Sequence, residues 1–537
     1  MTPPPAAPAA RPVSGLVMWL HGLLALLALW LFHSLLWWGF LNALPQQDTA
    51  DGLVLAVSAG LCGAAAVALS SVLSPWLLDR LLRVTWIKLE EAGDVGPHLR
   101  AVLEQCRLPV PYLGVVADSD PCALTYGLTR RAARLVVTRG LLESLDVDQQ
   151  CAIVTHEAAH LASGDFRLAT LFAGPIFILT RVKETYASMS ARGGTADDST
   201  SPSSQVGGLM IPVVGLLIRA YALIYAGFAQ CREVWADQFT QRRVDARALE
   251  GALLALLTRL AGPSPTRHAL AVAARGFTPV DAVSAGRLGT ASAWSGQFDT
   301  AQLARTAAVV ASNPATELSQ QSALHPPIGT RLPSEALPVQ TVSALTLLRL
   351  FASTLPAVGF GAGLLVVLMA GGIFGLPLIM WGLGRMIALG LAFGRMHGSV
   401  QNEAGLRDVL EKLASEPARA YQTELVGRFV GRGVPGVTWC TDAVFECAGV
   451  YLAVRPCVLV GSAGGGVRDQ VLGDIEGKAC KVRGVLRTAD VPYLELHAVE
   501  SDGQLVWRSA YVVSSLIWST ALVMLGILLI APQWAGF

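Results

Sequence analysis

Long uncharged stretches dominate the beginning of this chain. Residues 15–41 carry no charged side chain and, at about 1.5 Å per residue in a helix, reach about 40 Å, enough to cross a hydrocarbon core of about 30 Å. Residues 53–78 form a second uncharged stretch, after a short connector with two Asp and no Lys or Arg. The pattern predicts an N-terminal membrane hairpin. Its first segment is longer than the apolar core of a secretory signal, so we expect an uncleaved anchor.

Further apolar segments predict additional membrane spans. They lie at residues 168–179, 206–229, 345–369, 373–393 and 509–530. With the N-terminal hairpin the total is about seven spans. The loop at 181–205, rich in Ser, Thr, Gly and Asp, is expected outside the cytoplasm, and so is the C-terminus.

Basic residues set the expected orientation. Arg80, Arg83 and Lys88 follow the second apolar segment, whereas the connector before that segment has none. Because cytoplasmic flanks of membrane spans are enriched in Lys and Arg, we expect the chain after residue 79 to enter the cytoplasm. The protein is therefore predicted to lie in a membrane, expected to be the bacterial inner membrane, with its large polar sections at the cytoplasmic face.

The polar sections between the apolar segments show two different patterns. The sections before residue 340 read mainly as helices, with a strand pair at 122–127 and 134–139. Residues 396–508 instead alternate β-branched residues with glycines, which predicts a small β-barrel or sandwich, similar to an oligonucleotide/oligosaccharide-binding barrel in strand number and glycine placement. The predicted units begin with an N-terminal membrane hairpin (1–78) and a mainly α domain (79–340) that includes a membrane hairpin at about 168–229. A further membrane hairpin (341–395), a cytoplasmic β-rich domain (396–508) and a terminal span (509–537) follow.

Composition agrees with an integral membrane protein. Of the 537 residues 53% are hydrophobic and 15% charged, with a mean hydropathy of +0.50, which excludes a wholly soluble protein. The formal net charge of +1 gives no sign of nucleic-acid binding. The nine Cys contain no CxxC pair, so a cysteine zinc site is not expected.

The strongest chemical motif is His156-Glu157-Ala158-Ala159-His160. Two histidines four apart share one face of a helix and can bind one cation. Zinc accepts such neutral nitrogen ligands and leaves room for a third protein ligand and a water. In this motif the carboxylate of Glu157 is placed to accept a proton from that water. The alternative interpretation is two histidines held by ordinary hydrogen bonds.

A second pair of residues at helical spacing supplies the expected third ligand. Glu233 and Asp237 directly follow the apolar segment 206–229. We assign Glu233 to the zinc and Asp237 to a hydrogen bond that orients one histidine. Taken alone, such a pair is more often a solvated helix face, but its position after a membrane hairpin that begins just downstream of the histidines favours a metal ligand.

Together these motifs resemble those of the HtpX-like membrane zinc metallopeptidases, relatives of the CAAX prenyl proteases. The resemblance extends over about residues 15–335 and includes Ser163-Gly164-Asp165 and the later His325-Pro326-Pro327 with Arg331. It implies a gluzincin domain with one zinc per chain, held by His156, His160 and Glu233, with Glu157 as general base. Damaged or misassembled membrane proteins are the substrates that it implies.

Three functions follow from the sequence as hypotheses. The first is an integral membrane zinc endopeptidase that hydrolyses peptide bonds in membrane protein quality control. The second is a processing protease for one defined, CAAX-like substrate. The third is a catalytically silent membrane scaffold whose β-rich domain binds a partner. The partners in the first two are a peptide or membrane protein and the lipid bilayer. The sequence does not determine the oligomeric state or the role of residues 396–508.

Overall fold

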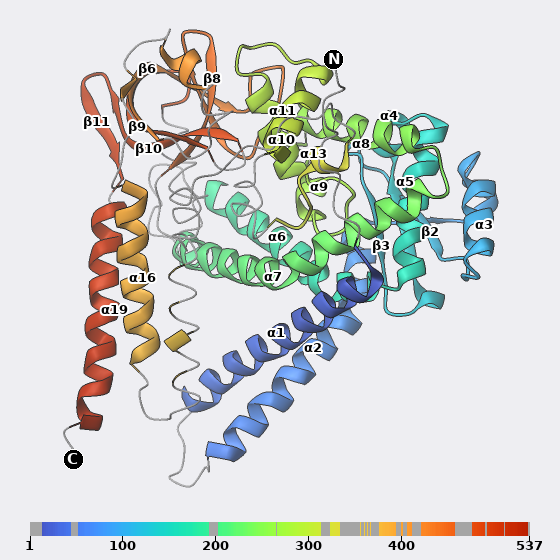
Figure 1. Ribbon diagram of the computed structural model, residues 1–537, viewed down its shortest axis with the longest axis horizontal. Helices are drawn as coiled ribbons and strands as arrows, with labels where there is room; N and C mark the ends of the chain where they lie inside the picture. Colours follow the sequence, from blue (N-terminus) through green and yellow to red (C-terminus); the bar gives the residue numbers. More distant parts are fainter. Residues whose placement is uncertain are drawn as a thin grey trace, which may run out of the picture.

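The computed structural model describes most of the chain. The described residues are 13–43, 52–192, 202–312 without 265, 323–332, a few isolated positions before residue 375, 375–393, 399–400, 405–410, 420–456, 475–488, 491–509 and 511–534. Two units account for most of them outside the long apolar helices. We call residues 84–332 the helical domain and residues 420–508 the barrel. Figure 1 shows the two units side by side above the apolar helices.

Two pairs of long apolar helices extend to the same side of the molecule (Figure 1). α1 (Gly15–Ala43) packs along α2 (Gly52–Leu82), and α16 (Leu376–Phe393) packs along α19 (Tyr511–Trp534). Many of their large apolar side chains are exposed, which is typical of helices whose outer faces contact lipid. Examples are Leu16, Leu61, Trp76, Ile517 and Trp518.

The number of spans differs from the prediction. Within the described residues three helical segments are long and apolar enough to cross a membrane, Gly15–Ser34, Ala56–Leu82 and Val512–Ile530. A fourth is reached only if α5 (Val147–Ser163) and the start of α6, which meet at 109°, count as one broken span. About seven spans are therefore not shown. The described part of α16 is too short to be counted, and segment 345–369 lies almost wholly outside the described residues.

The segments predicted as the third and fourth spans form two packed helices. They are α6 (Phe166–Arg192) and α7 (Pro202–Gln241). The loop expected at 181–205 is wrong over residues 181–192, which continue α6 as a helix, and over residues 202–205, which begin α7. Its polar composition suggested a loop, but polar side chains are compatible with a helix when they pair along its face. Arg181 and Glu184 make such a pair, with Nη1 and Oε2 3.0 Å apart.

A four-stranded sheet of order β1-β2-β4-β3 lies at one side of the helical domain. Its strands are β1 (Thr85–Ile87), β2 (Tyr112–Val116), β3 (Ala123–Tyr126) and β4 (Arg134–Thr138). The antiparallel pairing of β3 with β4 confirms the predicted strand pair. Tyr126 and Arg134 both donate hydrogen bonds to Asp79 near the end of α2, which ties the sheet to the membrane hairpin.

α5 runs through the centre of the helical domain. Asp146 caps its first turn by accepting a hydrogen bond from Gln149 N, and Gln149 Oε1 accepts one from Asp146 N in return. Gly164 ends the helix in the left-handed conformation, at a φ of 80°. The helix packs against α3 (Val95–Gln105), α7, α8 (Ala246–Ala261) and β3. These neighbours bury every residue from Ala152 to Leu161.

The C-terminal unit is a closed barrel rather than a sandwich. Its strands are β6 (Tyr421–Arg432), β7 (Ala443–Cys447), β8 (Val450–Pro456), β9 (Ala479–Thr488) and β10 (Pro492–Ser501). They pair in the order β6-β7-β8-β10-β9, and β9 pairs back to β6, which closes the ring. β5 (Ser399–Val400) and β11 (Gln504–Arg508) extend it at two sides. Closure removes free strand edges, and the alternating side chains fill the interior. Residues 457–474 of the predicted β-rich section lie outside the described residues.

The barrel docks on the helical domain through the connection between β6 and β7. Trp439 N donates a hydrogen bond to Ala261 O at the end of α8, over 3.1 Å. Asp442 accepts one from Arg287 on α10 (Ala282–Ser292), also over 3.1 Å. From strand β8, Tyr451 N donates to Trp294 O over 2.8 Å. Backbone hydrogen bonds between two units fix their relative position more tightly than side-chain contacts alone.

Candidate metal centre

Two histidines of α5 converge at the centre of the helical domain. The rings of His156 and His160 have centroids 5.1 Å apart, and both side chains are buried. With Glu157 they form a group in which one potential ligand atom from each residue lies within 4.8 Å of the others. The four-residue spacing on α5 produces this arrangement, because residues one turn apart share a helix face.

α7 brings Glu233 to the same point. Glu233 Oε2 lies 3.2 Å from His156 Nε2, and Glu233 Oε1 lies 3.8 Å from His160 Nε2. One carboxylate therefore faces the same nitrogen of both imidazoles. Two buried atoms beside it, His160 Nε2 and Glu157 Oε1, have no hydrogen-bond partner among the described residues. Two imidazoles and a carboxylate are a donor set that zinc accepts, and a cation would satisfy these atoms.

Each histidine also has a carboxylate at its other nitrogen. Asp237 Oδ1 lies 3.1 Å from His156 Nδ1, and Asp165 Oδ2 lies 3.0 Å from His160 Nδ1. In metal sites such partners orient the ring and leave Nε2 free for the cation. Sequence reasoning assigned this role to Asp237 and gave Asp165 none. The position of Asp165 directly after the helix-ending Gly164 was the available signal.

Glu157 is held from the sheet. Thr125 Oγ1 on the edge strand β3 donates a hydrogen bond to Glu157 Oε2 over 2.6 Å. The carboxylate is fully buried, and burial raises its pKa above the ordinary value. Its other oxygen, Oε1, is the unpartnered one. Thr125 was not predicted as a site residue, because nothing in the sequence places it against α5.

The buried charges around this point do not balance. With the imidazoles neutral and the carboxylates ionised, as metal ligands must be, four carboxylates face two guanidinium groups, which leaves an excess of two negative charges. The carboxylates are those of Glu157, Asp165, Glu233 and Asp237, and the guanidinium groups those of Arg232 and Arg331. Because unpaired buried charge is costly, the excess favours a divalent cation.

The pKa values of the site residues reflect the same excess of negative charge. Burial opposes the ionised form of Glu233, but His156 and Arg232 hold the pKa of this carboxyl well below its usual range. Burial likewise opposes a protonated His156, yet Asp237 and Glu233 raise its pKa to about 9. The site therefore attracts positive charge, and a metal ion would take the place of the proton.

His325, which received no catalytic role from the sequence, lies buried near the centre. His325 Nε2 is 2.5 Å from the carbonyl oxygen of Thr278. Arg331, six residues later, donates to both oxygens of Asp237, with Nε to Oδ2 at 2.6 Å and Nη2 to Oδ1 at 2.9 Å. The segment that carries His325 and Arg331 therefore contacts the metal centre through the ion pair of Arg331 with Asp237.

Comparison with known proteins gives a consistent match to one family. Residues 91–334 match the model of Peptidase family M48. Protease HtpX of Photorhabdus laumondii is 28% identical over 229 residues, which cover 40% of this chain and 75% of that protein. The HtpX homologue of Thermococcus sibiricus is 27% identical over 221 residues, covering 40% and 73%. The barrel lies outside the family match.

One solved structure, the crystal structure of S. mikatae Ste24p, also aligns. It is 14% identical, covers 45% of this chain and 59% of its own, and has a TM-score of 0.26. At that score the alignment carries no argument about the site.

Proposed function

We propose that the protein is an integral membrane zinc endopeptidase with one zinc per chain, because residues 91–334 match the model of Peptidase family M48 and the chain is similar to HtpX proteases. His156, His160 and Glu233 hold the metal, and Glu157 is the general base. The observation that carries this assignment is the carboxylate of Glu233, which faces Nε2 of both histidines beside the unpartnered oxygen of Glu157.

The chain's own residues divide the chemistry between them. Zinc in such a site polarises the scissile carbonyl and makes water more acidic. Glu157 accepts the proton of the attacking water and passes it to the leaving amine, while Thr125 holds its second oxygen in place. Asp165 and Asp237 orient the two imidazoles. The raised pKa of Glu157 suits a group that must both accept and release a proton.

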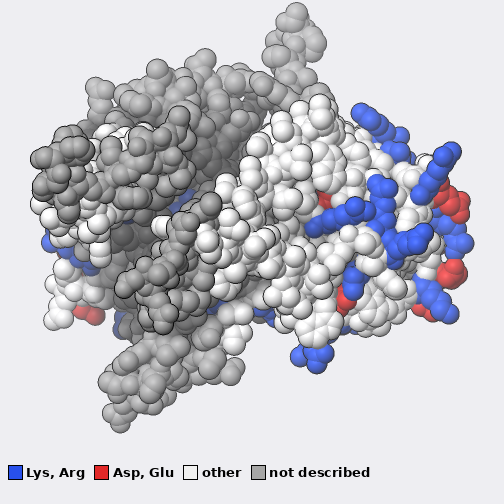
Figure 2. Space-filling model, turned by 90° about the horizontal axis from the view of Figure 1, so that it is seen from below, with Lys and Arg blue, Asp and Glu red and all other residues white. Residues whose placement is uncertain are grey.

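The proposed site faces the cytoplasm. Figure 2 shows Lys and Arg gathered at the right of the face seen from below, on the side where the helical domain lies in Figure 1. Exposed basic residues that follow the second span include Arg80, Arg83 and Lys88. Such enrichment supports a cytoplasmic location beside the bacterial inner membrane. The proposed topology keeps about seven spans by adding residues 168–179 of α6, residues 206–229 of α7, segment 345–369 and α16 to the three candidate segments.

The proposed substrates are peptides and membrane proteins, with a role in membrane protein quality control. The alternative function is that of a processing protease for a single CAAX-like substrate. Cleavage of several unrelated unfolded proteins favours the first, and cleavage of one tagged candidate alone favours the second. A catalytically silent scaffold is the third possibility, and purified protein without zinc would support it.

Removing the metal is the direct test of the proposal. We expect detergent-purified protein to digest unfolded β-casein, to lose this activity in a zinc chelator and to regain it when zinc is restored. The physical reason is that the side chains of the protein do not by themselves polarise the carbonyl, which needs the cation that the three proposed ligands hold. Digestion that continues unchanged in the chelator, after loss of zinc has been measured, contradicts the proposal.

Asp165, whose carboxylate contacts His160 Nδ1, allows a test in which zinc binding is weakened and not abolished. Asp165→Asn is expected to weaken zinc binding by about 10- to 100-fold, because the neutral amide no longer supports the imidazole as a ligand. Competition with a fluorescent zinc chelator measures this change. Asp148→Asn makes the same chemical substitution on the exposed first turn of α5 and should leave the affinity unchanged. Equal affinities in both variants would remove Asp165 from the site.

A further inference from the structure

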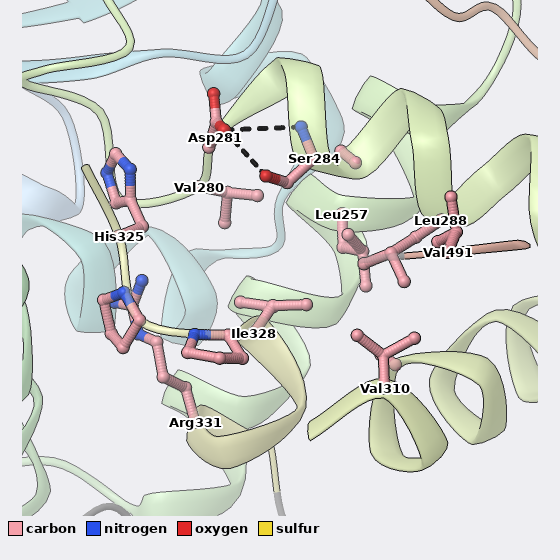
Figure 3. Close-up of a pocket in the computed structure, with 14 residues that line it drawn as sticks. Leu257, Val280, Asp281, Ser284, Leu288, Val310, His325, Ile328, Arg331 and Val491 are labelled. Atoms are coloured by element: carbon pink, nitrogen blue, oxygen red, sulfur yellow. Dashed lines mark hydrogen bonds between the residues drawn. The ribbon is translucent and has the colours of Figure 1, made fainter. Parts of the chain in front are cut away.

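A small cavity lies in the helical domain beside the metal centre. Its volume is about 30 Å³. Figure 3 shows the polar side chains of its wall on one side and the apolar side chains on the other. The polar side has Asp281, His325 and Arg331, and the apolar side has Leu257, Leu288, Val310 and Val491. A pocket that is mainly apolar with a few polar groups at one end is typical of sites that bind a side chain.

Arg331 joins this cavity to the proposed metal ligands. It lines the cavity, pairs with both oxygens of Asp237, and has Nη2 3.6 Å from Glu233 Oε2. His325 also lines the cavity. The polar end of the cavity is therefore one side chain away from the proposed third ligand.

The barrel supplies part of the cavity wall. Val491 lies on the connection between β9 and β10, is 1% exposed, and packs in the core of the helical domain. In return, Trp294 of the helical domain packs against the core of the barrel. The hydrogen bonds of Trp439 to Ala261 and of Tyr451 to Trp294 hold the two units in this position. Val491 is thus fixed in the wall by contacts from both units.

We propose that this cavity receives the substrate side chain next to the scissile bond, and that Val491 limits its size. The inference rests on the proposed peptidase function and adds a preference for small apolar residues. About 10–15 Å³ of such volume accommodates one water, so about 30 Å³ fits a side chain such as Ala or Val and not a large one. The barrel thereby determines specificity in a domain that otherwise resembles its relatives.

Cleavage-site mapping tests the proposal. Unfolded β-casein is digested by the full-length protein and the fragments are identified by mass spectrometry. We expect wild-type cleavage sites to favour Ala and Val at one position next to the scissile bond. Val491→Ala enlarges the cavity and should shift that position toward Leu, Met and Phe by about tenfold, since a methylene in an apolar pocket changes selectivity by about 10- to 200-fold.

Two further variants keep the test decisive. Val310→Ala enlarges the same cavity from the helical domain and should shift the same position. Val506→Ala removes the same atoms from an exposed site on β11 and should change nothing. Unchanged residue preferences in both cavity variants, with cleavage retained, overturn the proposal for the cavity alone. Casein cleavage that is absent, or equal in Glu157→Gln, is instead a failure of the proposed peptidase function.

Discussion

Replacing Glu157 with Gln is expected to slow cleavage of unfolded β-casein by about 10²- to 10⁴-fold while zinc stays bound. The amide has nearly the same shape as the carboxylate, and it can still accept the hydrogen bond from Thr125. It cannot accept a proton from water. The loss should therefore appear in the rate and not in metal content, which elemental analysis of the purified protein measures.

The control for this variant is Glu143→Gln, an identical change on an exposed residue of α4 (Arg139–Ser144). It should cleave at the wild-type rate. Undiminished turnover in Glu157→Gln would refute the assignment of the general base. A wild-type protein that neither cleaves casein nor contains zinc would instead favour the scaffold hypothesis.

Glu233→Gln is expected to lower the zinc content from about one per chain to a small fraction of that, and to abolish cleavage with it. The substitution removes a charged ligand from a set of three. It also leaves Arg232 and Arg331 without one of the carboxylates that balance them. Breaking a buried ion pair by removing one partner costs about 3–5 kcal/mol, so the midpoint of thermal unfolding should fall as well.

Metal content and unfolding must be measured together for this variant. If zinc is lost only because the variant unfolds, the purified variant will show no thermal unfolding transition even before it is dialysed to remove loosely bound zinc. A folded variant with little zinc supports Glu233 as ligand. A folded variant that keeps zinc at the wild-type stoichiometry excludes that role, and Glu143→Gln serves again as the matched control.

Part of the site could be predicted from the spacing of residues along single helices. Residues four apart on a helix share a face whatever the rest of the chain does, so the pairs His156 with His160 and Glu233 with Asp237 were recognisable in the sequence. Their convergence needed α5 to pack against α7, which the membrane hairpin predicted between the two pairs and the resemblance to a family suggested. Asp165 and Thr125 reach the same point through a helix end and a strand edge, and no periodic pattern marks such contacts.

The membrane-spanning part shows the limits of apolar patterns. Hydrophobic stretches identified α1, α2 and α19 because a bilayer imposes a minimum length on an apolar helix. The same reasoning treated residues 181–192 as a loop, although paired polar side chains continue α6 there. In the β-rich section, alternation predicted strands but left barrel and sandwich open, since closure depends on which strands pair.

The sequence alone determined what short-range chemistry dictates: three helices long and apolar enough to cross a membrane, the imidazole pair with its acidic neighbour, and a C-terminal unit made of strands. Tertiary structure decided what depends on distant segments meeting. It brought the carboxylate of Glu233 to both imidazoles, left two negative charges in excess in a buried centre, and set Val491 of the barrel into the wall of the neighbouring cavity. Periodicity describes a residue's neighbours on its own helix or strand, whereas packing chooses its neighbours from the whole chain.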